Sequence, residues 1–221
     1  NGIPNEIESS RFASVAAFAG RFFYAGLSSA KHSGRILFTK TITQRTDYEI
    51  CHQVADPTSE VDPLLVDSDG GSININECYG IKKLFVYGNS LLVFAENGIW
   101  SIAGPDGVFK ATEFFITKIS SIGLLNRDSF VDTEGTPFWW GDNGIYTFEE
   151  DRVTLQPSLR NLTEQTIKSF FEDILPQKRL SAKGIYDRDT REVFWLYQDN
   201  TETLPNKFNK LLVFSLDTGS F

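Results

Sequence analysis

The feature of this sequence that most restricts its fold is a hairpin pattern that occurs twice, 46 residues apart. A shift by that distance places Asn97-Gly-Ile-Trp100 on Asn143-Gly-Ile-Tyr146, with apolar residues on both sides of each turn. Asn-Gly favours two-residue hairpin turns because both residues tolerate positive φ, which suits the twist of the flanking strands. The recurrence predicts an internal repeat of one antiparallel sheet with three or four strands. Further matched positions are Leu92 with Phe138, Phe94 with Trp140, and Ile102 with Phe148.

Short apolar runs bounded by turn residues form each copy of the repeat, as is typical of antiparallel sheets. Predicted strands of the first copy are 83–87, 91–95 and 99–102, with turns at Gly88-Asn89 and Asn97-Gly98. Predicted strands of the second copy are 129–132, 137–141 and 145–148, with turns at Glu134-Gly135 and Asn143-Gly144.

Two looser copies flank this pair. The first has strands at 14–19, 22–25 and 35–38 with a turn at Gly20-Arg21, and the second has strands at 180–186, 192–197 and 210–215. Successive antiparallel sheets of this size predict an all-β, propeller-like fold with about four antiparallel blades, forming either most of a ring or part of one. We place the blades near 11–40, 81–104, 128–156 and 179–217 of a propeller fragment that spans 1–221.

Aromatic side chains should fill the layers between these sheets. The chain has 19 Phe, 7 Tyr and 4 Trp residues, and rings of this size supply much of the apolar area that a sheet face must bury. The residues that we expect in the layers are Phe94, Trp100, Trp140, Tyr146, Phe148 and Trp195.

Two stretches interrupt the repeat. Residues 41–80 form a polar, acidic excursion that contains Asp56-Pro-Thr-Ser-Glu60. Residues 161–174 predict one inserted short helix, with Asn161 as N-cap, Glu164 completing a capping box, and Pro176 ending it. Its predicted apolar face consists of Ile167, Phe170, Phe171 and Ile174. Such a helix either covers a sheet edge or contacts a neighbour, and covering is the commoner arrangement.

Composition excludes several classes of protein. With 221 residues, of which 41% are hydrophobic and 23% charged, the chain can bury a substantial core and is not intrinsically disordered. No apolar run approaches the ~20 residues of a membrane-spanning helix, so no membrane span is predicted. The first residue is not Met and the last strand stops just past its turn, so we expect a piece of a longer polypeptide.

The net charge of −8 argues against a protein that grips DNA through its phosphates. The one cationic cluster, Gln177-Lys-Arg179 with Lys168 and Lys183 nearby, is predicted to be an ordinary solvated face. Cys51 and Cys78 have no partners at zinc-ligand spacing; they are either two buried thiols, as a reducing cytoplasm favours, or a disulfide.

Two acidic motifs invite a functional interpretation. Asp67-Ser-Asp69-Gly-Gly71 with Glu77 resembles part of a calcium loop but lacks the Gly and Glu at EF-hand spacing, so a turn is favoured over an irregular calcium site. Ser215-Leu-Asp217-Thr-Gly219-Ser-Phe221 resembles an Asp-box, a structural hairpin turn in sialidase-type propellers, although its aromatic residue falls one position early.

No catalytic, cofactor-binding or metal-binding residues are predicted. A glycosidase would need two facing carboxylates, yet most of its candidates fall in predicted turns. His32 and His52 lie in no recognisable catalytic context, and a Cys51–His52 dyad is disfavoured because neighbours on one strand point to opposite faces. The carboxylates considered are Asp132, Glu134, Asp142, Glu149, Glu150, Asp187 and Asp189.

Four segments together resemble the propeller region of short-tailed bacteriophage tail proteins, the tail tubular protein B or nozzle family. These segments are 11–26, 33–39, 51–60 and 91–100. The resemblance spans most of 11–148 and continues weakly from Tyr186 to Gly219.

The resemblance implies a structural, non-enzymatic virion protein, assembled in the host cytoplasm into a homo-oligomer expected to be a hexamer. It implies a nozzle that contacts tail adaptor and fibre proteins and lets genomic DNA pass without sequence-specific binding. An acidic conduit would suit this role, because it releases few counterions on contact with DNA. Two alternatives stay open: a propeller glycoside hydrolase or lyase, and a glycan- or protein-binding propeller module.

Overall fold

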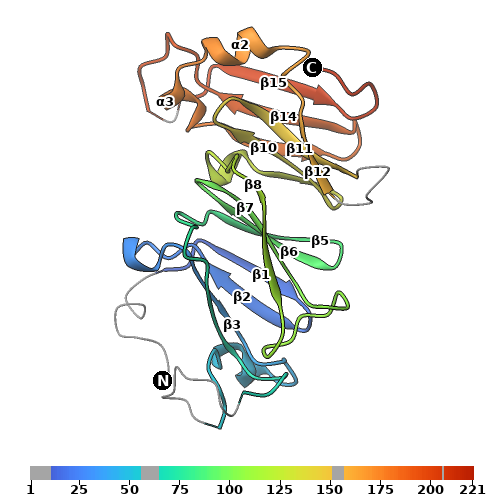
Figure 1. Ribbon diagram of the computed structural model, residues 1–221. Coiled ribbons are helices and arrows are strands. Elements are labelled where there is room, and N and C mark those ends of the chain that lie inside the picture. Colours follow the sequence, from blue (N-terminus) through green and yellow to red (C-terminus); the bar gives the residue numbers. More distant parts are fainter. Residues whose placement is uncertain (1–10, 56–64, 151–156, 206) are drawn as a thin grey trace. The chain divides into compact units, whose positions relative to one another are not determined.

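The computed structural model describes residues 11–55, 65–150, 157–205 and 207–221. Across these ranges the chain is nearly all β, with fifteen strands in four antiparallel sheets and two short helices (Figure 1). The prediction of an all-β, propeller-like fold is confirmed. The chain divides into two compact units, Asn1–Ser121 and Ile122–Phe221, and each unit contains two of the sheets.

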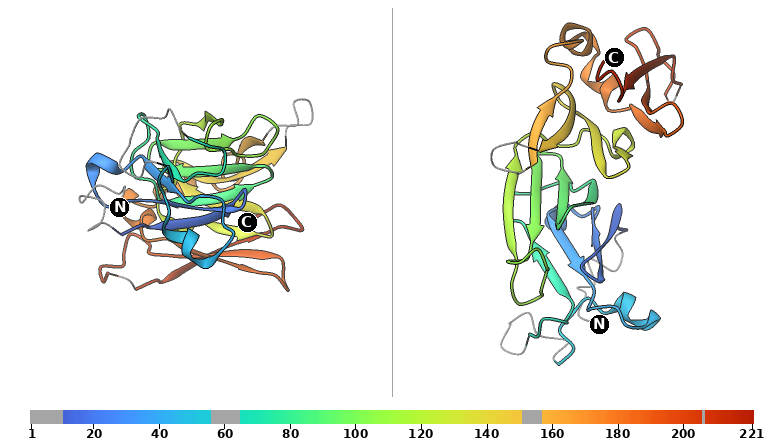
Figure 2. Two further views of the ribbon diagram at one scale, coloured as in Figure 1. Left: turned by 90° about the horizontal axis from the view of Figure 1, so that it is seen from below. Right: turned by 90° about the vertical axis from the view of Figure 1, so that its right-hand side faces the viewer.

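The first unit contains sheets A and B. In both sheets each strand pairs with the one before it, and Figure 2 shows this meander from further directions. Sheet A consists of β1 (Ser14–Phe18), β2 (Arg21–Ala25), β3 (Arg35–Phe38) and β4 (Gly71–Asn74). Sheet B consists of β5 (Lys83–Tyr87), β6 (Ser90–Ala95), β7 (Gly98–Ala103) and β8 (Phe115–Ser120). Short 3₁₀ helices lie at Ala30–His32 and Arg45–Glu49.

The second unit contains sheets C and D, again as meanders. Sheet C consists of β9 (Val131–Thr133), β10 (Thr136–Gly141), β11 (Gly144–Glu150) and β12 (Pro157–Asn161). Sheet D consists of β13 (Lys183–Asp187), β14 (Glu192–Tyr197) and β15 (Lys210–Ser215). A 3₁₀ helix at Arg127–Ser129 precedes β9, and α2 (Lys168–Asp173) and α3 (Pro176–Arg179) connect the two sheets.

Within each unit the sheets pack as neighbouring propeller blades do, with their first strands adjacent. In the first unit β1 contacts β5, and in the second unit β9 contacts β13. This arrangement follows from the sequence, because each sheet is a meander with apolar residues on both faces. An apolar face is buried only when it packs against another sheet.

The 46-residue repeat is confirmed at the level of strand register. In sheet B the residues that flank the β6–β7 turn are Ala95 and Gly98, and in sheet C the residues that flank the β10–β11 turn are Gly141 and Gly144. The turns themselves lie one residue earlier than predicted, at 96–97 and 142–143. The turn predicted at Gly20-Arg21 also shifts by one residue, because Phe18 pairs with Arg21.

The glycine after each of these turns is needed for close approach and belongs to the strand. A Cβ at Gly98 would lie 2.5 Å from the backbone oxygen of Ser120 in the adjacent strand. A Cβ at Gly144 would lie 2.6 Å from Oδ1 of Asn161, in the corresponding strand of sheet C. The two glycines therefore allow the fourth strand to approach the third in both copies of the repeat.

An apolar cluster fills the space between sheets A and B. Phe23 of β2 contacts Phe38 of β3 and Phe109 of the loop before β8, with ring centroids 5.7 and 5.1 Å apart. Trp100 of β7 belongs to the same cluster, as predicted.

A second cluster lies between sheets C and D and is centred on Trp140. Its ring centroid is 6.4 Å from Trp195 of β14 and 5.1 Å from Phe171 of α2. The predicted placement of Trp140 and Trp195 between sheets is therefore confirmed. Of the six predicted layer residues, the other three, Phe94, Tyr146 and Phe148, are also buried, but on the opposite faces of their strands and outside both clusters.

The predicted helix over 161–174 is wrong in extent. Asn161 ends β12, and its Oδ1 accepts a hydrogen bond from the Thr163 backbone N–H at 2.9 Å, so the local side-chain bond forms a turn where a helix cap was expected. The helix begins only at Lys168, and Pro176 starts α3. Phe171 and Ile174 are buried in the cluster of the second unit while Phe170 is exposed, so this segment covers the core of that unit.

Three strands lie where the sequence predicted excursion, loop or blade end. β4 comes from within the predicted 41–80 excursion and pairs with β3, completing sheet A, while Asp56-Pro-Thr-Ser-Glu60 lies outside the described residues. β8 and β12 likewise complete sheets B and C. No helix within the described ranges is long and apolar enough to cross a membrane.

We expect Trp140→Ala to lower the free energy of unfolding by about 3–5 kcal/mol, because it leaves a large cavity between sheets C and D. Chemical denaturation followed by circular dichroism measures the change. Phe115→Ala, which removes an exposed aromatic ring from β8, is the control and should change the stability by about 0.5 kcal/mol or less. An unchanged midpoint for Trp140→Ala would contradict the packing described above.

Candidate functional site

Four of the carboxylates considered for a glycosidase pair form local hydrogen bonds or ion pairs: Asp132, Glu134, Glu149 and Asp187. Asp132 Oδ1 accepts a hydrogen bond from the Gly135 N–H at 2.7 Å, and Asp187 Oδ1 accepts one from the Asp189 N–H at 2.9 Å. Glu134 pairs with Arg188 at 2.6 Å. Glu149 pairs with Arg160, Asp142 lies in the β10–β11 turn, and the Glu150 side chain lies outside the described part of the structure.

The histidines and cysteines are held in separate local environments. His52 Nδ1 lies 3.1 Å from the Gln53 carbonyl oxygen, and His32 is buried in a 3₁₀ helix. Cys51 and Cys78 are free, buried thiols, as the first of the two alternatives predicted. Burial raises the pKa of each thiol to about 12, so both are protonated and weakly nucleophilic at neutral pH.

The loop that resembles a calcium site is bound by a guanidinium. Arg21, at the start of β2, is 2% exposed and donates Nη1 hydrogen bonds to the carbonyl oxygens of Thr39, at 2.9 Å, and Ser68, at 3.4 Å. It also donates to the carbonyl oxygens of Asp67 and Asp69. Backbone oxygens that could have faced a metal ion thus face a side-chain cation.

Rings and carboxylates surround this guanidinium. Its central carbon lies 5.7 Å from the ring centroids of both Phe38 and Phe109, within cation–π range. Burial lowers the pKa of Arg21, while the charges of Asp69 and Asp67 raise it, and an arginine stays charged under these conditions.

The two acidic side chains of this loop bond to protein groups. Asp69 is buried and accepts hydrogen bonds from the backbone N–H groups of Val54 and Val66. A hydrogen bond from Thr112, together with the Lys110 ammonium, lowers the pKa of Asp67. The favoured interpretation of this motif as a turn is therefore consistent with its contacts, and no group of three or more His, Cys, Asp or Glu residues in the described ranges is arranged to hold a metal ion.

The structural role of Arg21 was not predicted, although the alternation of residues along its strand indicates that this side chain faces the core. Alternation along 21–25 places Arg21 on the same face as the buried Phe23 and Ala25. A charged residue on a core-facing position must bind buried polar partners.

Asp47 is a buried carboxylate in the 3₁₀ helix Arg45–Glu49, which follows β3. Its Oδ2 accepts hydrogen bonds from the Thr43 and Gln44 backbone N–H groups at 2.8 and 2.9 Å, and its Oδ1 lies 3.3 Å from Lys40 Nζ. These bonds, with that of the Thr43 N–H the largest contribution, hold the pKa of Asp47 far below its usual range. The contacts fix the loop beside β3.

The cationic cluster of the second unit is solvated at Lys168 and Lys183, as predicted, but not at Arg179. Arg179 is buried and donates to the backbone oxygens of Ile174 at 2.7 Å, Glu172 at 2.8 Å and Asp142, with its guanidinium 4.9 Å from the Phe171 ring centroid. Lys168 and Lys183 pair with Glu164 and Asp128, at 2.7 and 3.7 Å. Arg179 therefore bonds to backbone groups, and the two lysines form ion pairs with exposed carboxylates.

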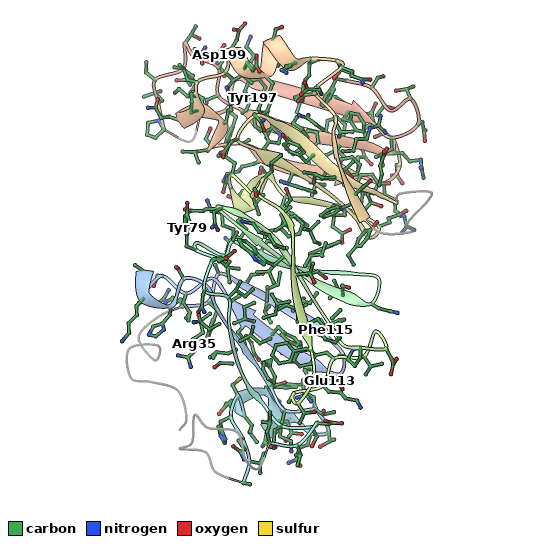
Figure 3. The ribbon with its side chains drawn as sticks, viewed as in Figure 1. Arg35, Tyr79, Glu113, Phe115, Tyr197 and Asp199 are labelled. Atoms are coloured by element: carbon green, nitrogen blue, oxygen red, sulfur yellow. The ribbon has the colours of Figure 1, made fainter. Side chains whose placement is uncertain are left out.

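The loop that follows β14 is organised around Asp199, which Figure 3 shows just beyond Tyr197. Its Oδ1 accepts hydrogen bonds from Thr201 Oγ1 at 2.7 Å, the Thr201 N–H at 2.9 Å and Asn209 Nδ2 at 2.9 Å. The side-chain bond from Thr201 is the largest cause of a pKa far below the usual range of an aspartate. Burial raises the pKa of the neighbouring Tyr197.

The Asp-box-like segment is a hairpin turn, as predicted. The Ser215 N–H donates to the Ser220 carbonyl oxygen at 2.9 Å, and Asp217 pairs with Arg191 at 2.7 Å. Phe221 then packs on Phe214 with ring centroids 5.0 Å apart.

Among the described residues, the outer face of sheet D has the most exposed apolar side chains on adjacent strands. The inner face, which carries Trp195 and Phe214, packs in the cluster with sheet C. The strand register places Ile185, Phe194 and Val213 in one row of the outer face, and Lys183, Leu196 and Leu211 in the next. Ile185, Leu196 and Leu211 are 66%, 44% and 53% exposed. A flat apolar sheet face of this kind is a candidate docking surface.

Two smaller apolar surfaces lie in the first unit. Phe115 is exposed on the edge strand β8 (Figure 3). On the outer face of sheet A, Val15 lies beside Tyr24 and is 54% exposed. The ring of Tyr48 packs edge-on against Phe22 on this face, with centroids 5.2 Å apart.

We expect Arg21→Met to lower the free energy of unfolding by about 2–4 kcal/mol, because it leaves buried carbonyl oxygens of the 67–69 loop without donors. Denaturation curves should show this loss, while the exposed control Arg188→Met should stay within about 0.5 kcal/mol of wild type. Adding Ca²⁺ at about 1 mM should leave the wild-type midpoint unchanged, because the guanidinium already binds these oxygens. Stabilisation by Ca²⁺ would contradict the assignment of this loop.

Comparisons with known proteins do not assign this chain to a family. No protein-family model matches the chain, and no curated protein matches its sequence.

Proposed function

We propose that the chain is a structural component of a short-tailed bacteriophage tail, in which its propeller-like sheets form part of the nozzle through which DNA is ejected. In this proposal the protein is not an enzyme. It acts as a homo-oligomer, expected to be a hexamer, that contacts tail adaptor and fibre proteins in the virion.

The observation that carries the proposal is the stacking of repeated meander sheets through aromatic layers. Such a pair of sheets is stiff because within each unit one sheet buries its rings against the other, as Trp140 does against Trp195. The segments that resemble the nozzle family fall on this repeat: 11–26 covers β1 and β2, 33–39 covers β3, and 91–100 covers most of β6 and the start of β7. Of the remaining segment, 51–60, the part from 56 to 60 lies outside the described residues.

Charge supports the same role. The net charge of −8 disfavours binding to DNA phosphates, and a conduit must let DNA slide without retaining it. Arg21 and Arg179, the two described arginines that are buried, bond to backbone carbonyl oxygens and are not presented to a polyanion.

The alternatives predict different chemistry. A glycoside hydrolase or lyase would place two carboxylates across a cleft, whereas Asp132 and Asp187 accept hydrogen bonds from nearby backbone N–H groups. A binding module would act as a monomer through a patch on one face. The outer face of sheet D would suit the binding surface of such a module as well as a contact between subunits. The test must therefore distinguish a binding module from a tail component.

The proposal predicts that the chain is present in purified particles of the phage that encodes it, at several copies per particle by quantitative mass spectrometry. Antibodies against the chain should label the distal end of the tail in electron micrographs, because the nozzle lies there. Purified protein should not retain duplex DNA at low salt.

Absence of the chain from particles that contain the other tail proteins would overturn the proposal. Cleavage of host surface polysaccharide by the purified chain, lost on Asp132→Asn or Glu134→Gln, would instead establish the enzyme. The Asp106→Asn variant, which changes an exposed turn residue, is the matched control for that assay.

A further inference from the structure

One edge of the strand β15 has no partner strand along most of its length. β15 is the last strand of sheet D, whose order is β13-β14-β15, whereas sheets A, B and C each contain four strands (Figure 1). Among the described residues, β14 is the only strand that pairs with β15 from end to end. The opposite edge of β15, called here the free edge, therefore presents backbone N–H and C=O groups that a further strand would pair with.

A hydrogen bond of Ser215 shows which backbone groups of β15 point to the free edge. The Ser215 N–H donates to the Ser220 carbonyl oxygen at 2.9 Å, on the side away from β14. Backbone groups of successive residues in a strand point to opposite edges, so those of Leu211 and Val213 point the same way as those of Ser215. The residues between them bond to β14. Leu211 and Val213 thus present two N–H donors and two carbonyl acceptors at the free edge.

The chain itself already forms a short antiparallel pairing on this edge. After β15 the turn at 216–219 reverses the chain, and Ser220 forms an antiparallel bridge with Ser215. Phe221 then packs on Phe214 and against the apolar cluster of the second unit. On the same edge, no described residue pairs through its backbone with 210–213. The edge is therefore shaped to accept an antiparallel strand, and the stretch 210–213 is where one would continue.

The free edge lacks the features that usually prevent strand addition. Edge strands are commonly interrupted by proline or a bulge, or carry a charge in their centre. The sequence of β15 is Lys210-Leu-Leu-Val-Phe-Ser215, so its one charge lies at its first residue, and its register with β14 has no bulge. That lysine forms an ion pair with Asp199 at 3.7 Å. By comparison, β12, the fourth strand of sheet C, begins with Pro157 and carries Arg160.

The side chains beside the free edge define the chemistry of a matching strand. Leu211 and Val213 lie on the outer face of sheet D, where Leu211 is exposed and Val213 is partly buried. Residues directly opposite each other on antiparallel strands share a face of the sheet and contact each other. Aliphatic residues opposite Leu211 and Val213 would therefore bury their exposed apolar surface.

We propose that the free edge of β15 binds an extended segment of a partner protein, which adds to sheet D as an antiparallel fourth strand. The backbone of this segment exchanges hydrogen bonds with Leu211 and Val213, and its aliphatic side chains lie beside theirs. In this mode main-chain bonds supply affinity and alternate side chains supply selectivity. The inference goes beyond the proposed function and does not depend on it, since a tail component and a binding module can both use such an edge.

Amide hydrogen exchange of the chain alone tests whether the edge is free. The amides of Leu212 and Phe214, which bond to β14, should exchange at least about tenfold more slowly than those of Leu211 and Val213. Nuclear magnetic resonance resolves the four amides individually. Equal protection of all four would show that residues of the chain already cover this edge, and would overturn the proposal.

Strand addition is tested with a synthetic peptide of alternating valine and threonine that has a lysine at each end. The peptide should slow amide exchange at Leu211 and Val213 by about tenfold or more. The same peptide N-methylated at its valines should bind at least about tenfold more weakly, because it lacks the N–H groups that donate to the two carbonyl oxygens. Equal binding of both peptides, or no binding of either at about 2 mM, would overturn the proposal.

Two variants of the protein separate the edge from the adjacent sheet face. Val213→Pro removes an N–H that points to the free edge, where an edge strand tolerates proline, and should abolish peptide binding while the circular dichroism spectrum stays unchanged. Ile185→Lys, in the same row of the outer face but on β13, is the matched control and should bind the peptide as wild type does. The reverse pattern would place the peptide on the sheet face and contradict the proposal. If Val213→Pro does not fold, the pair of peptides still tests the proposal on the wild-type chain.

Discussion

The packing of rings between sheets is the interaction on which the rest of this structure depends. A three- or four-stranded meander pairs the backbone groups between its strands but leaves two apolar faces, and an isolated sheet of this size would expose them to water. Phe23 in the first unit and Trp140 in the second unit solve this problem by packing between two sheets. The stability of each unit is therefore a property of pairs of sheets and not of single ones.

A buried arginine in each unit also holds the loops against these pairs of sheets. In each unit one buried arginine, Arg21 or Arg179, donates hydrogen bonds to at least three backbone carbonyl oxygens and lies against an aromatic ring of the core. A guanidinium suits this task because its planar fork carries five donors and stacks on rings. Long loops can thereby pack against the sheets without leaving buried carbonyl groups unsatisfied. The acidic residues of these loops then serve structure, which explains why their motifs resembled functional sites.

Local patterns in the sequence predicted the strands well where both faces of a strand are buried. The β6–β7 and β10–β11 hairpins follow from apolar runs around turns, and their repeat gave the correct register with a one-residue error in the turns. The strand β8 was missed because it is an edge strand, exposed along most of its length, and its residues carry no clear apolar alternation. The helix at 161–174 was overextended because Asn161 bonds to Thr163 equally well in a turn. Contacts between residues far apart in the chain, such as Arg21 with the 67–69 loop, depend on the tertiary fold, so local patterns could indicate a buried arginine but not its partners.

A double-mutant cycle between Trp140 and Trp195 tests the central claim most directly, because the two rings belong to different sheets of the second unit. Their unfolding free energies, measured singly and together with Ala at each position, isolate the energy of contact across the layer. If the sheets pack through these rings, the coupling should be about 0.5–1.5 kcal/mol. Additive effects, with no coupling between the two positions, would contradict this account of the fold.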